Sequence, residues 1–264
     1  MASTIPLLET LEITLSATGV VELAFSRPKR YNALSALSYR DWLAAIQWAA
    51  TCDAVKVVVL TGRGKYYTSG QELVAPDTSP EGVENSKKRR NVTKTLVDEL
   101  INFPKLLIAG VNGPAIGFGV TSLALCDIVY SVPEATFGTP FMKLGFCAEG
   151  CSSILFPKIM GPSKANEMLL MGRTFTAQEL EQCGFISQII PLEGFKEKIL
   201  EIAEKAAEFS GVAMGITKKL IRDNEREKLL LVNDIEMKQL SLCMESKESM
   251  DQILLFVNKR KSRL

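Results

Sequence analysis

The chain has 264 residues, of which 47% are hydrophobic and 23% are charged, a composition typical of a folded globular protein of one large domain and not of a disordered chain. Its 31 basic and 30 acidic residues nearly balance, which argues against a nucleic-acid-binding protein and against a membrane-surface protein. Histidine is absent, which excludes Ser-His-Asp and Cys-His catalysis and leaves proton transfer to carboxylates, Lys, Tyr, Cys or backbone groups.

The first 130 residues alternate between strand-like and helix-like patterns. Segments 9–15 and 20–26 both alternate in hydrophobicity around Ala17-Thr18-Gly19, which predicts a β-hairpin. Ser35 is the expected N-cap of a helix over 36–51. The further strands expected here are 55–60, 106–111 and 127–132, and the further helices are 86–102 and 117–125. Strands that alternate with helices predict an α/β fold with a parallel sheet and right-handed crossovers.

Beyond about residue 150 the pattern becomes helical. The expected helices are 152–160, 163–171, 176–183, 194–209, 212–222, 227–245 and 246–259. We therefore expect an α/β core over residues 1–195 and a helical C-terminal region over 196–264, packed on the core or on a neighbouring subunit.

Neither end of the chain has the pattern of a secretory or membrane-anchoring segment. No basic stretch followed by an apolar core opens the sequence, and no apolar run reaches the roughly 18 residues of a membrane span. The last residues, Ser262, Arg263 and Leu264, form a conservative variant of the Ser-Lys-Leu address that a peroxisomal import receptor reads. The expected location is the peroxisome, although three residues can also match such a pattern by chance.

Six scattered cysteines form no CxxC pair, so we expect reduced thiols and no metal site. The basic run 87–90 is interpreted as the solvated start of a helix or a mobile loop, with a nuclear signal as the weaker alternative. The segment 117–122 resembles a dinucleotide-binding loop only superficially, because Ser122 stands where the third glycine is needed. A nucleotide-cofactor dehydrogenase and an NTPase are both rejected.

Two glycine-containing turns follow neighbouring core strands. Residues 66–73 follow the strand over 55–60, and residues 112–119 follow the strand over 106–111 and open a helix. Turns after adjacent parallel strands lie at the same edge of a sheet, where α/β folds bind ligands. The backbone N–H groups of Gln71 and Phe118 could converge there as an oxyanion hole. Ordinary strand-to-helix turns explain the same residues equally well.

Four motifs occur in order along the chain, namely Arg27-Pro-Lys-Arg-Tyr-Asn-Ala-Leu34, Ser69-Gly-Gln-Glu72, Asn112-Gly-Pro-Ala-Ile-Gly117 and Leu125-Cys-Asp-Ile-Val129. On these motifs the chain resembles the crotonase (enoyl-CoA hydratase/isomerase) superfamily over nearly its whole length. The resemblance implies a spiral of ββα units with a C-terminal helical trimerisation region, and hence a homotrimer or a dimer of trimers. It also implies an acyl-CoA substrate, with no cofactor beyond the coenzyme A that the substrate itself carries.

What the resemblance implies for individual residues can be stated position by position. The thioester carbonyl would be held by the N–H groups of Gln71 and Phe118. The substrate-binding residues implied are Lys29, Ala33, Thr68, Ser69, Gly70, Gln71, Glu72, Gly117 and Phe118. The acyl tunnel is expected to be lined by loops and helices around 74–100.

The side chains discriminate between reactions of this family. Hydratases use two glutamates, and at the matching positions this chain has Thr121 and Phe141. Glu149 stands instead in the segment Ala148–Ser153, which resembles the Pro-Glu-Gly-Cys-Ser-Ser stretch of Δ3,Δ2-enoyl-CoA isomerases, especially the peroxisomal type. The implied activity is a shift of a 3-cis or 3-trans double bond to trans-2 during β-oxidation of unsaturated fatty acids.

A physical argument for Glu149 stands beside the resemblance. One carboxylate that reaches both C2 and C4 can remove the first proton and return the second, and apolar neighbours would raise its pKa toward neutrality. The simpler alternative is that Glu149 complements a helix N-terminus. Two other functions also stay open: another acyl-CoA-processing crotonase, such as a hydratase-like enzyme of secondary metabolism, and a non-catalytic module that binds CoA or protein.

Overall fold

A six-stranded sheet forms the centre of the computed structural model, which describes residues 4–261. In spatial order its strands are β1 (Leu11–Leu15), β2 (Val20–Phe25), β3 (Val57–Gly62), β4 (Leu106–Val111), β6 (Ile128–Ser131) and β9 (Gln188–Ile189). β1 pairs antiparallel with β2, and every later pair is parallel. The predicted hairpin and the three predicted core strands are thus present, and the α/β fold is confirmed.

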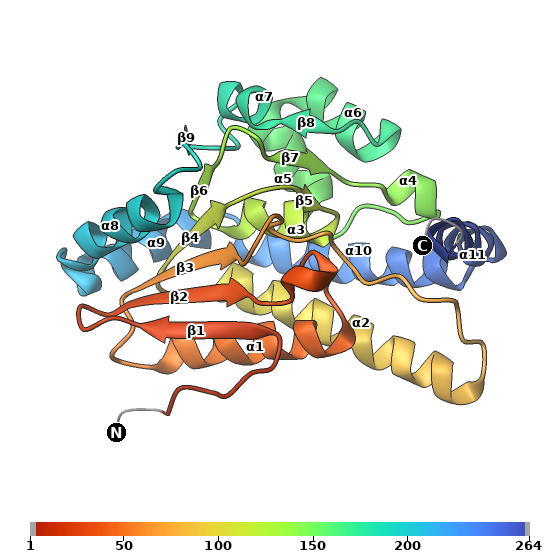
Figure 1. Cartoon of the computed structure of the whole chain (residues 1–264), viewed down its shortest axis with the longest axis horizontal. Coiled ribbons are helices and arrows are strands. Elements are labelled where there is room, and N and C mark those ends of the chain that lie inside the picture. The colour runs from red at the N-terminus through yellow and green to blue at the C-terminus, as the bar shows by residue number, and fades with distance from the viewer. Residues whose placement is uncertain (1–3, 262–264) are drawn as a thin grey trace.

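A second, three-stranded sheet stands beside the first (Figure 1). It consists of β5 (Ala115–Ile116), β7 (Thr136–Gly138) and β8 (Phe175–Thr176). The prediction that residues beyond 150 are entirely helical is wrong at β8 and β9. Each has only two residues, too few to show the alternation by which a strand is recognised in sequence.

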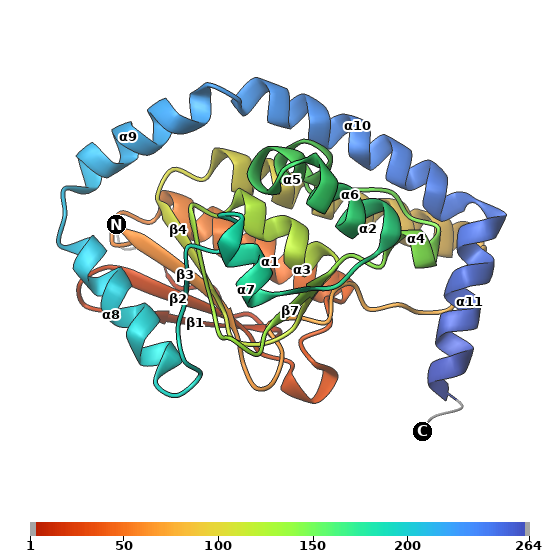
Figure 2. The same ribbon diagram turned by 90° about the horizontal axis from the view of Figure 1, so that it is seen from above.

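The helices surround the two sheets (Figure 1). They are α1 (Ala36–Thr51), α2 (Pro80–Asn102), α3 (Phe118–Thr121), α4 (Phe141–Leu144), α5 (Ser152–Met160), α6 (Pro162–Met171), α7 (Ala177–Gln182), α8 (Phe195–Ala207), α9 (Gly211–Asp223), α10 (Arg226–Glu245) and α11 (Lys247–Lys261), with 3₁₀ turns at Pro28–Arg30 and Ser122–Leu125. α1 and α2 pack against each other below the sheet. Figure 2 shows α9 and α10 along one long side and α11 turning back at the end of α10. No helix within the described residues is both long and apolar enough to cross a membrane.

Polar caps fix where the two N-terminal helices begin. Ser35 accepts a hydrogen bond from Ser38 N, as expected for the N-cap of α1. α2 begins six residues before its predicted start, because Ser79 caps it by accepting from Gly82 N and Pro80 occupies its first turn. The segment 80–86 has no apolar periodicity, so its helical state depends on this cap and on the rest of the helix.

The strands β2 and β3 form the buried centre of the sheet, and every residue of both is buried. Glu22 is the one charged residue on them, and it accepts two hydrogen bonds from the guanidinium of Arg63, at 2.7 and 2.9 Å. This pair holds the turn after β3 against β2.

Asp127 joins three elements at the start of β6. Its carboxylate accepts from Leu107 N of β4 at 2.8 Å, from Lys218 Nζ of α9 at 2.7 Å and from Arg222 Nη2 at 3.2 Å. Lys218 is buried, so its charged ammonium group is stabilised in the fold by the Asp127 carboxylate. Asp127 therefore attaches the C-terminal helical region to the core.

Replacing Asp127 by Asn should lower the free energy of unfolding by about 3 kcal/mol, because the buried Lys218 ammonium loses its counter-charge. Urea denaturation measures the change. Asp223→Asn is the matched control. The Asp223 carboxylate forms ion pairs on the surface of α9, the helix that carries Lys218, and its loss should change the free energy of unfolding little. Equal effects of the two substitutions would contradict the role assigned to Asp127.

Candidate functional site

The Asn32 side chain ties the segment after β2 to the turn after β3. Its Oδ1 accepts from Arg27 N at 2.9 Å, and its Nδ2 donates to the carbonyls of Arg63, Tyr66 and Tyr67. Asn32 is 1% exposed and has a left-handed backbone, φ 54°, which asparagine tolerates better than most residues. The two segments are therefore fixed relative to each other by one buried amide.

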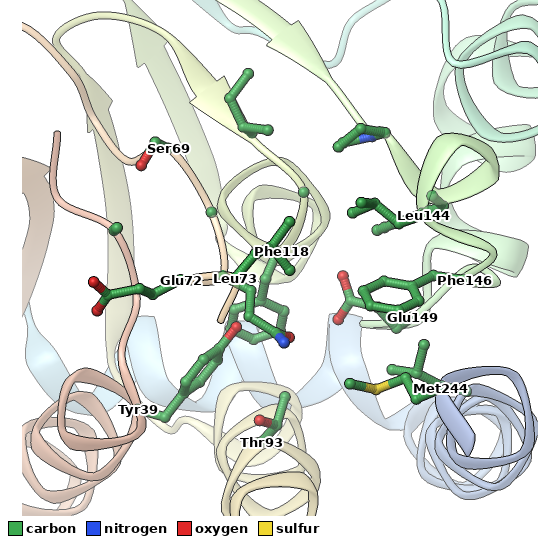
Figure 3. A pocket seen from close by; sticks show the side chains of 18 of the residues that line it. Tyr39, Ser69, Glu72, Leu73, Thr93, Phe118, Leu144, Phe146, Glu149 and Met244 are labelled. Carbon is green, nitrogen blue, oxygen red and sulfur yellow. The ribbon is translucent and has the colours of Figure 1, made fainter. Parts of the chain in front are cut away.

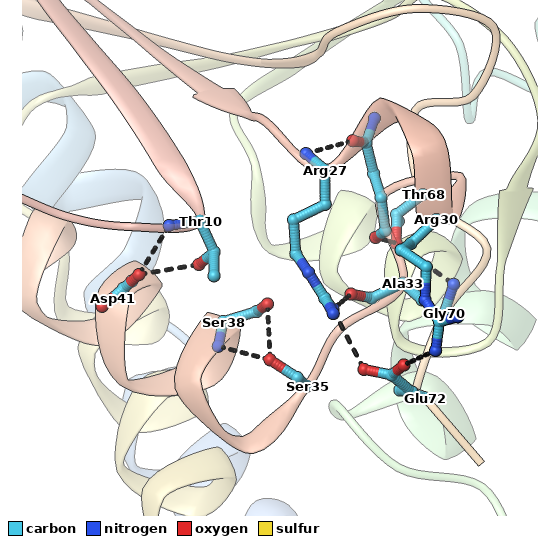
Figure 4. A network of polar contacts seen from close by, with 11 residues as sticks. Thr10, Arg27, Arg30, Ala33, Ser35, Ser38, Asp41, Thr68, Gly70 and Glu72 are labelled. Atoms are coloured by element: carbon cyan, nitrogen blue, oxygen red, sulfur yellow. Dashed lines mark hydrogen bonds and ion pairs between the residues drawn. The ribbon is translucent and has the colours of Figure 1, made fainter.

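The turn after β3 continues this network (Figure 4). Thr68 Oγ1 donates to the carbonyl of Asn32 at 2.6 Å and accepts from Gly70 N at 3.1 Å. Leu34 N donates to Gly70 O, and Glu72 N donates to Leu34 O. In a parallel bridge of this kind the residue between the two bonded ones directs its own N–H to the other side. The N–H of Gln71 therefore faces away from Leu34.

The second turn lies directly against the first. Ile116 N donates to Thr68 O at 3.0 Å, and a Cβ on Gly70 would stand only 2.6 Å from Ile116 O. A Cβ on Gly119 would stand 2.2 Å from the Thr68 methyl group. Glycine at both positions permits an approach that any side chain would prevent. Phe118, which opens α3, presents its N–H from this second turn.

In the part of the chain that the structure describes, neither Gln71 N nor Phe118 N donates a hydrogen bond to another group of the protein. Both residues line one cavity of about 540 Å³. Two unpaired donors from two turns at the same end of neighbouring parallel strands β3 and β4 can bind one oxygen between them. The geometry favours an oxyanion hole over ordinary connecting turns.

The same cavity brings together most of the residues predicted for the site (Figure 3). Those lining it are Ala33, Ser69, Gly70, Gln71, Glu72, Gly117, Phe118 and Glu149. Two predicted substrate-binding residues do not line it. Lys29 is exposed on the surface, and Thr68 is completely buried behind the turn, where its hydroxyl group holds Gly70.

Glu149 lines the same cavity as Gln71 and Phe118, and its carboxyl group points toward Phe118 in Figure 3. It is 5% exposed, and its Oε1 accepts from Thr121 Oγ1 at 2.7 Å. Its Oε2 has no hydrogen-bond partner among the described residues. The pKa of Glu149 is raised to about 8: burial is the largest cause, the Thr121 hydroxyl lowers the pKa in the opposite direction, and the nearby Glu236 carboxylate adds a smaller increase. This is a carboxyl group able to exchange a proton near neutral pH.

A different carboxylate serves the N-terminus of α5. Glu236 of α10 accepts from Cys151 N at 2.7 Å and from Ser153 N at 2.9 Å. These are the N–H groups that a helix-capping carboxylate satisfies. Because Glu236 already fills that role, the alternative that Glu149 merely complements the helix N-terminus is not supported.

Sequence reasoning missed much of the remaining wall. The expected region 74–100 supplies Arg89, Arg90 and Thr93, but further lining residues come from α1, α4, α10 and α11: Tyr39, Phe141, Leu144, Met237, Leu240, Met244 and Phe256. Nothing local in these helices marks them as neighbours of the site, because only the fold brings α10 and α11 beside α2.

The interpretation of the basic run 87–90 as a solvated helix start is wrong for its second half. Arg90 is buried, Arg89 is half-buried, and both line the cavity. The helical period held the missing signal, since Arg90, Thr93 and the core residue Val97 recur at spacings of three and four.

No group of three potential metal ligands among His, Cys, Asp and Glu occurs within the described residues.

Comparison with known proteins agrees with this geometry. The family model described as enoyl-CoA hydratase/isomerase matches residues 16–264. The chain is 42% identical to human enoyl-CoA delta isomerase 2 over 97% of its own length and 65% of that protein, so it spans less than two thirds of this relative. It is 40% identical to mouse enoyl-CoA delta isomerase 3, peroxisomal, over 84% of its own length and 70% of that protein. An enoyl-CoA hydratase/isomerase structure from Pseudoalteromonas atlantica T6c superposes with a TM-score of 0.86 at 26% identity, covering 95% of this chain and 98% of that chain.

Replacing Thr121 by Val should raise the pKa of Glu149 above its value of about 8, because the one hydrogen bond to the ionised carboxylate is removed. Infrared difference spectra recorded against pH follow this carboxyl group, and the Glu149→Gln protein identifies its band. Thr139→Val is the control, since that buried hydroxyl donates to Met168 O. An unchanged titration in Thr121→Val would contradict the assigned hydrogen bond.

Proposed function

This chain belongs to the enoyl-CoA hydratase/isomerase family, and we propose that it is a Δ3,Δ2-enoyl-CoA isomerase acting on unsaturated fatty enoyl-CoA during β-oxidation. One observation carries the proposal: a single buried carboxyl group, Glu149, lines the same cavity as two unpaired backbone N–H groups. The relatives named enoyl-CoA delta isomerase support the same activity.

The two N–H groups would bind the thioester oxygen of the substrate. Hydrogen bonds from Gln71 N and Phe118 N strengthen as negative charge develops on that oxygen, so they stabilise a dienolate more than the ground state. Both donors are held by buried hydrogen bonds and by close glycine contacts. No reorganisation of the turns is then needed during the reaction.

Glu149 would act as base and then as acid. Ionised Oε2 removes a proton from C2, and the C2–H electron pair forms a C1–C2 double bond while the π pair of the thioester carbonyl moves onto its oxygen. The product is a dienolate in which the new C1–C2 double bond is conjugated with the C3–C4 double bond. When Glu149 next gives the same proton to C4, the carbonyl re-forms and the C1–C2 pair becomes the C2–C3 double bond, in the trans configuration. The protein ends as it began, so the reaction needs no cofactor beyond the CoA of the substrate.

Hydration is the alternative within this family, and the site has little provision for it. Water addition asks for one group to activate water and another to deliver a proton. At the matching positions Thr121 donates a hydrogen bond from its hydroxyl group to Glu149, and Phe141 has an apolar ring. Measurable conversion of trans-2-enoyl-CoA to the hydroxyacyl product by the purified protein would favour the hydratase-like alternative.

A non-catalytic binding module is the third possibility. A module that only binds has no use for a buried carboxyl oxygen without a partner, which destabilises the fold whenever the group ionises. Retention of Glu149 together with both donors argues for an active site.

The proposed protein partners are further copies of the same chain and an import receptor. Large apolar side chains are exposed on and beside α9 and α10, which supports a homotrimer or a dimer of trimers: Phe209, Val212, Ile216, Leu220, Ile221, Leu231, Ile235 and Leu242. The tripeptide Ser262–Leu264 lies outside the described residues. The peroxisomal designation of the mouse relative supports its proposed role as a peroxisomal address.

Glu149→Gln should lower the rate of 3-enoyl-CoA isomerisation by about 10²–10⁴-fold, because the amide can neither accept nor deliver the proton. Conversion of 3-cis and 3-trans enoyl-CoA to trans-2-enoyl-CoA is followed by absorbance of the conjugated thioester. Glu193→Gln, an exposed residue outside the cavity, is the control. Normal turnover by Glu149→Gln would refute the assignment.

Measuring the free energy of unfolding against pH tests whether the Glu149 carboxyl group is buried. A cooperative unfolding transition in the same experiment shows that Glu149→Gln is folded. The folded-state pKa of about 8 exceeds the usual 4.5, so ionisation of Glu149 destabilises the wild type progressively as pH rises from 4.5 to about 8. Glu149→Gln avoids this loss. Its stability relative to the wild type should therefore increase across that window and level off above it.

Removal of Ser262–Leu264 should leave a fluorescently tagged protein in the cytosol, because the import receptor reads a free C-terminal tripeptide. The tag is placed at the N-terminus, and fluorescence microscopy against a peroxisomal marker gives the readout. Restoring a Ser-Lys-Leu terminus to the truncated chain is the positive control. Continued import of the truncated protein would show that the address lies elsewhere.

A further inference from the structure

One face of α2 forms a wall that passes from the main cavity into a second one. Thr93 lines the main cavity, Ser86 lines a neighbouring cavity of about 290 Å³, and Arg89 and Arg90 line both. At 1.5 Å per residue, the seven residues from Thr93 to Ser86 span about 10 Å. The second cavity thus continues the first beyond the two arginines.

The family resemblance implies that CoA lies along residues 27–34 and 68–72, and the second cavity is lined from the latter segment but not from the former. Arg30, Tyr31 and Ala33 line the main cavity, whereas none of residues 28–34 lines the second. Its wall comes from Ala36, the segment 71–78, the N-terminal half of α2, the end of α10 and the helix α11, and it adjoins the main cavity at Gln71 and Glu72. A substrate whose CoA lies along residues 27–34 and whose thioester lies at Gln71 would send the far end of its acyl chain toward Arg89.

Of the arginines that line the two cavities, Arg30 and Arg90 form ion pairs with carboxylates, and Arg89 forms none within the described residues. Glu72 accepts from both Arg27 and Arg30, at 3.1 and 2.6 Å. Arg90 donates to Glu245 at 2.6 Å and to Ser86 at 2.9 Å.

The remaining carboxylate of the second cavity, Asp77, accepts from Ser79 N at 2.9 Å. Within the described part of the chain, Arg89 has no carboxylate within ion-pair distance.

An unpaired guanidinium is a poor neighbour for a plain alkyl chain. Burial already lowers the pKa of Arg89, which shows that the protein environment disfavours its charge. A methyl-terminated chain packed against it would remove more water and provide no hydrogen bond. A carboxylate at the end of the chain would provide both the opposite charge and paired acceptors for the guanidinium fork.

We propose that Arg89 is a specificity-determining residue that selects 3-enoyl-CoA substrates whose acyl chain carries a carboxylate at its far end. The proposal rests on the isomerase function above. A site built for a charged group discriminates strongly against analogues that lack it, since the analogue leaves the arginine unpaired.

The test compares two 3-enoyl-CoA substrates of equal chain length, one ending in methyl and one in carboxylate, on the wild type and on Arg89→Leu. The ratio of kcat/KM, carboxylate over methyl, should fall by about 10- to 100-fold in Arg89→Leu, the range expected for one charge-assisted hydrogen-bonded pair. Lys88→Gln removes a neighbouring exposed charge of α2 and should keep the wild-type ratio.

A binding measurement separates this proposal from the proposed function. Calorimetric titration with the two saturated analogues, which cannot isomerise, should show the same loss of preference in Arg89→Leu. If neither substrate is isomerised but the binding preference is present, the isomerase assignment fails and the carboxylate site remains.

An equal loss on both substrates would overturn the proposal in favour of a contact between Arg89 and the CoA phosphates. Pantetheine thioesters, which lack the nucleotide and its phosphates, would then be unaffected by the substitution. An unchanged ratio in Arg89→Leu would also overturn it.

Discussion

A carboxyl group buried in an apolar cavity destabilises the folded chain whenever it ionises, and the structure around Glu149 is arranged to use that property. One oxygen is held by Thr121, the other is buried without a hydrogen-bond partner among the described residues, and burial is the largest cause of a pKa raised to about 8. A stronger set of donors would stabilise the carboxylate and weaken it as a base. The sparse contacts of Glu149 are therefore what its proposed chemistry requires.

This carboxyl group is useful only if two N–H groups stay in place across the cavity. They are held from behind, by Asn32 linking two segments and by the Thr68 hydroxyl linking Asn32 to Gly70. Thr68, predicted to bind substrate, instead supports a residue that does line the cavity. The conformation of the two glycine turns thus depends on the buried polar side chains of Asn32 and Thr68.

The C-terminal helices contribute more to the site than a surface for assembly. Glu236 of α10 accepts the N–H groups at the start of α5, so Glu149 is not needed as a cap for that helix. Residues of α10 and α11 also form part of the cavity wall, together with residues of α2. Asp127 attaches this region to the sheet through Lys218 and Arg222. The core and the helical region therefore form one functional unit.

The sequence by itself determined the α/β core, the Ser35 cap, the two glycine turns and Glu149, because these depend on local patterns: β-branched runs, a capping hydroxyl, glycines and an ordered set of motifs. It could not determine β8 and β9, which are too short to show a period, or the earlier start of α2, whose first turns hold Val83 as their one aliphatic side chain and so show no apolar period. Only the tertiary structure decided that Glu236 caps α5, that Thr68 turns away from the cavity and that Arg89 faces it unpaired. Each of these depends on contacts between residues far apart in the chain, and burial and pairing are properties of such contacts, not of local sequence.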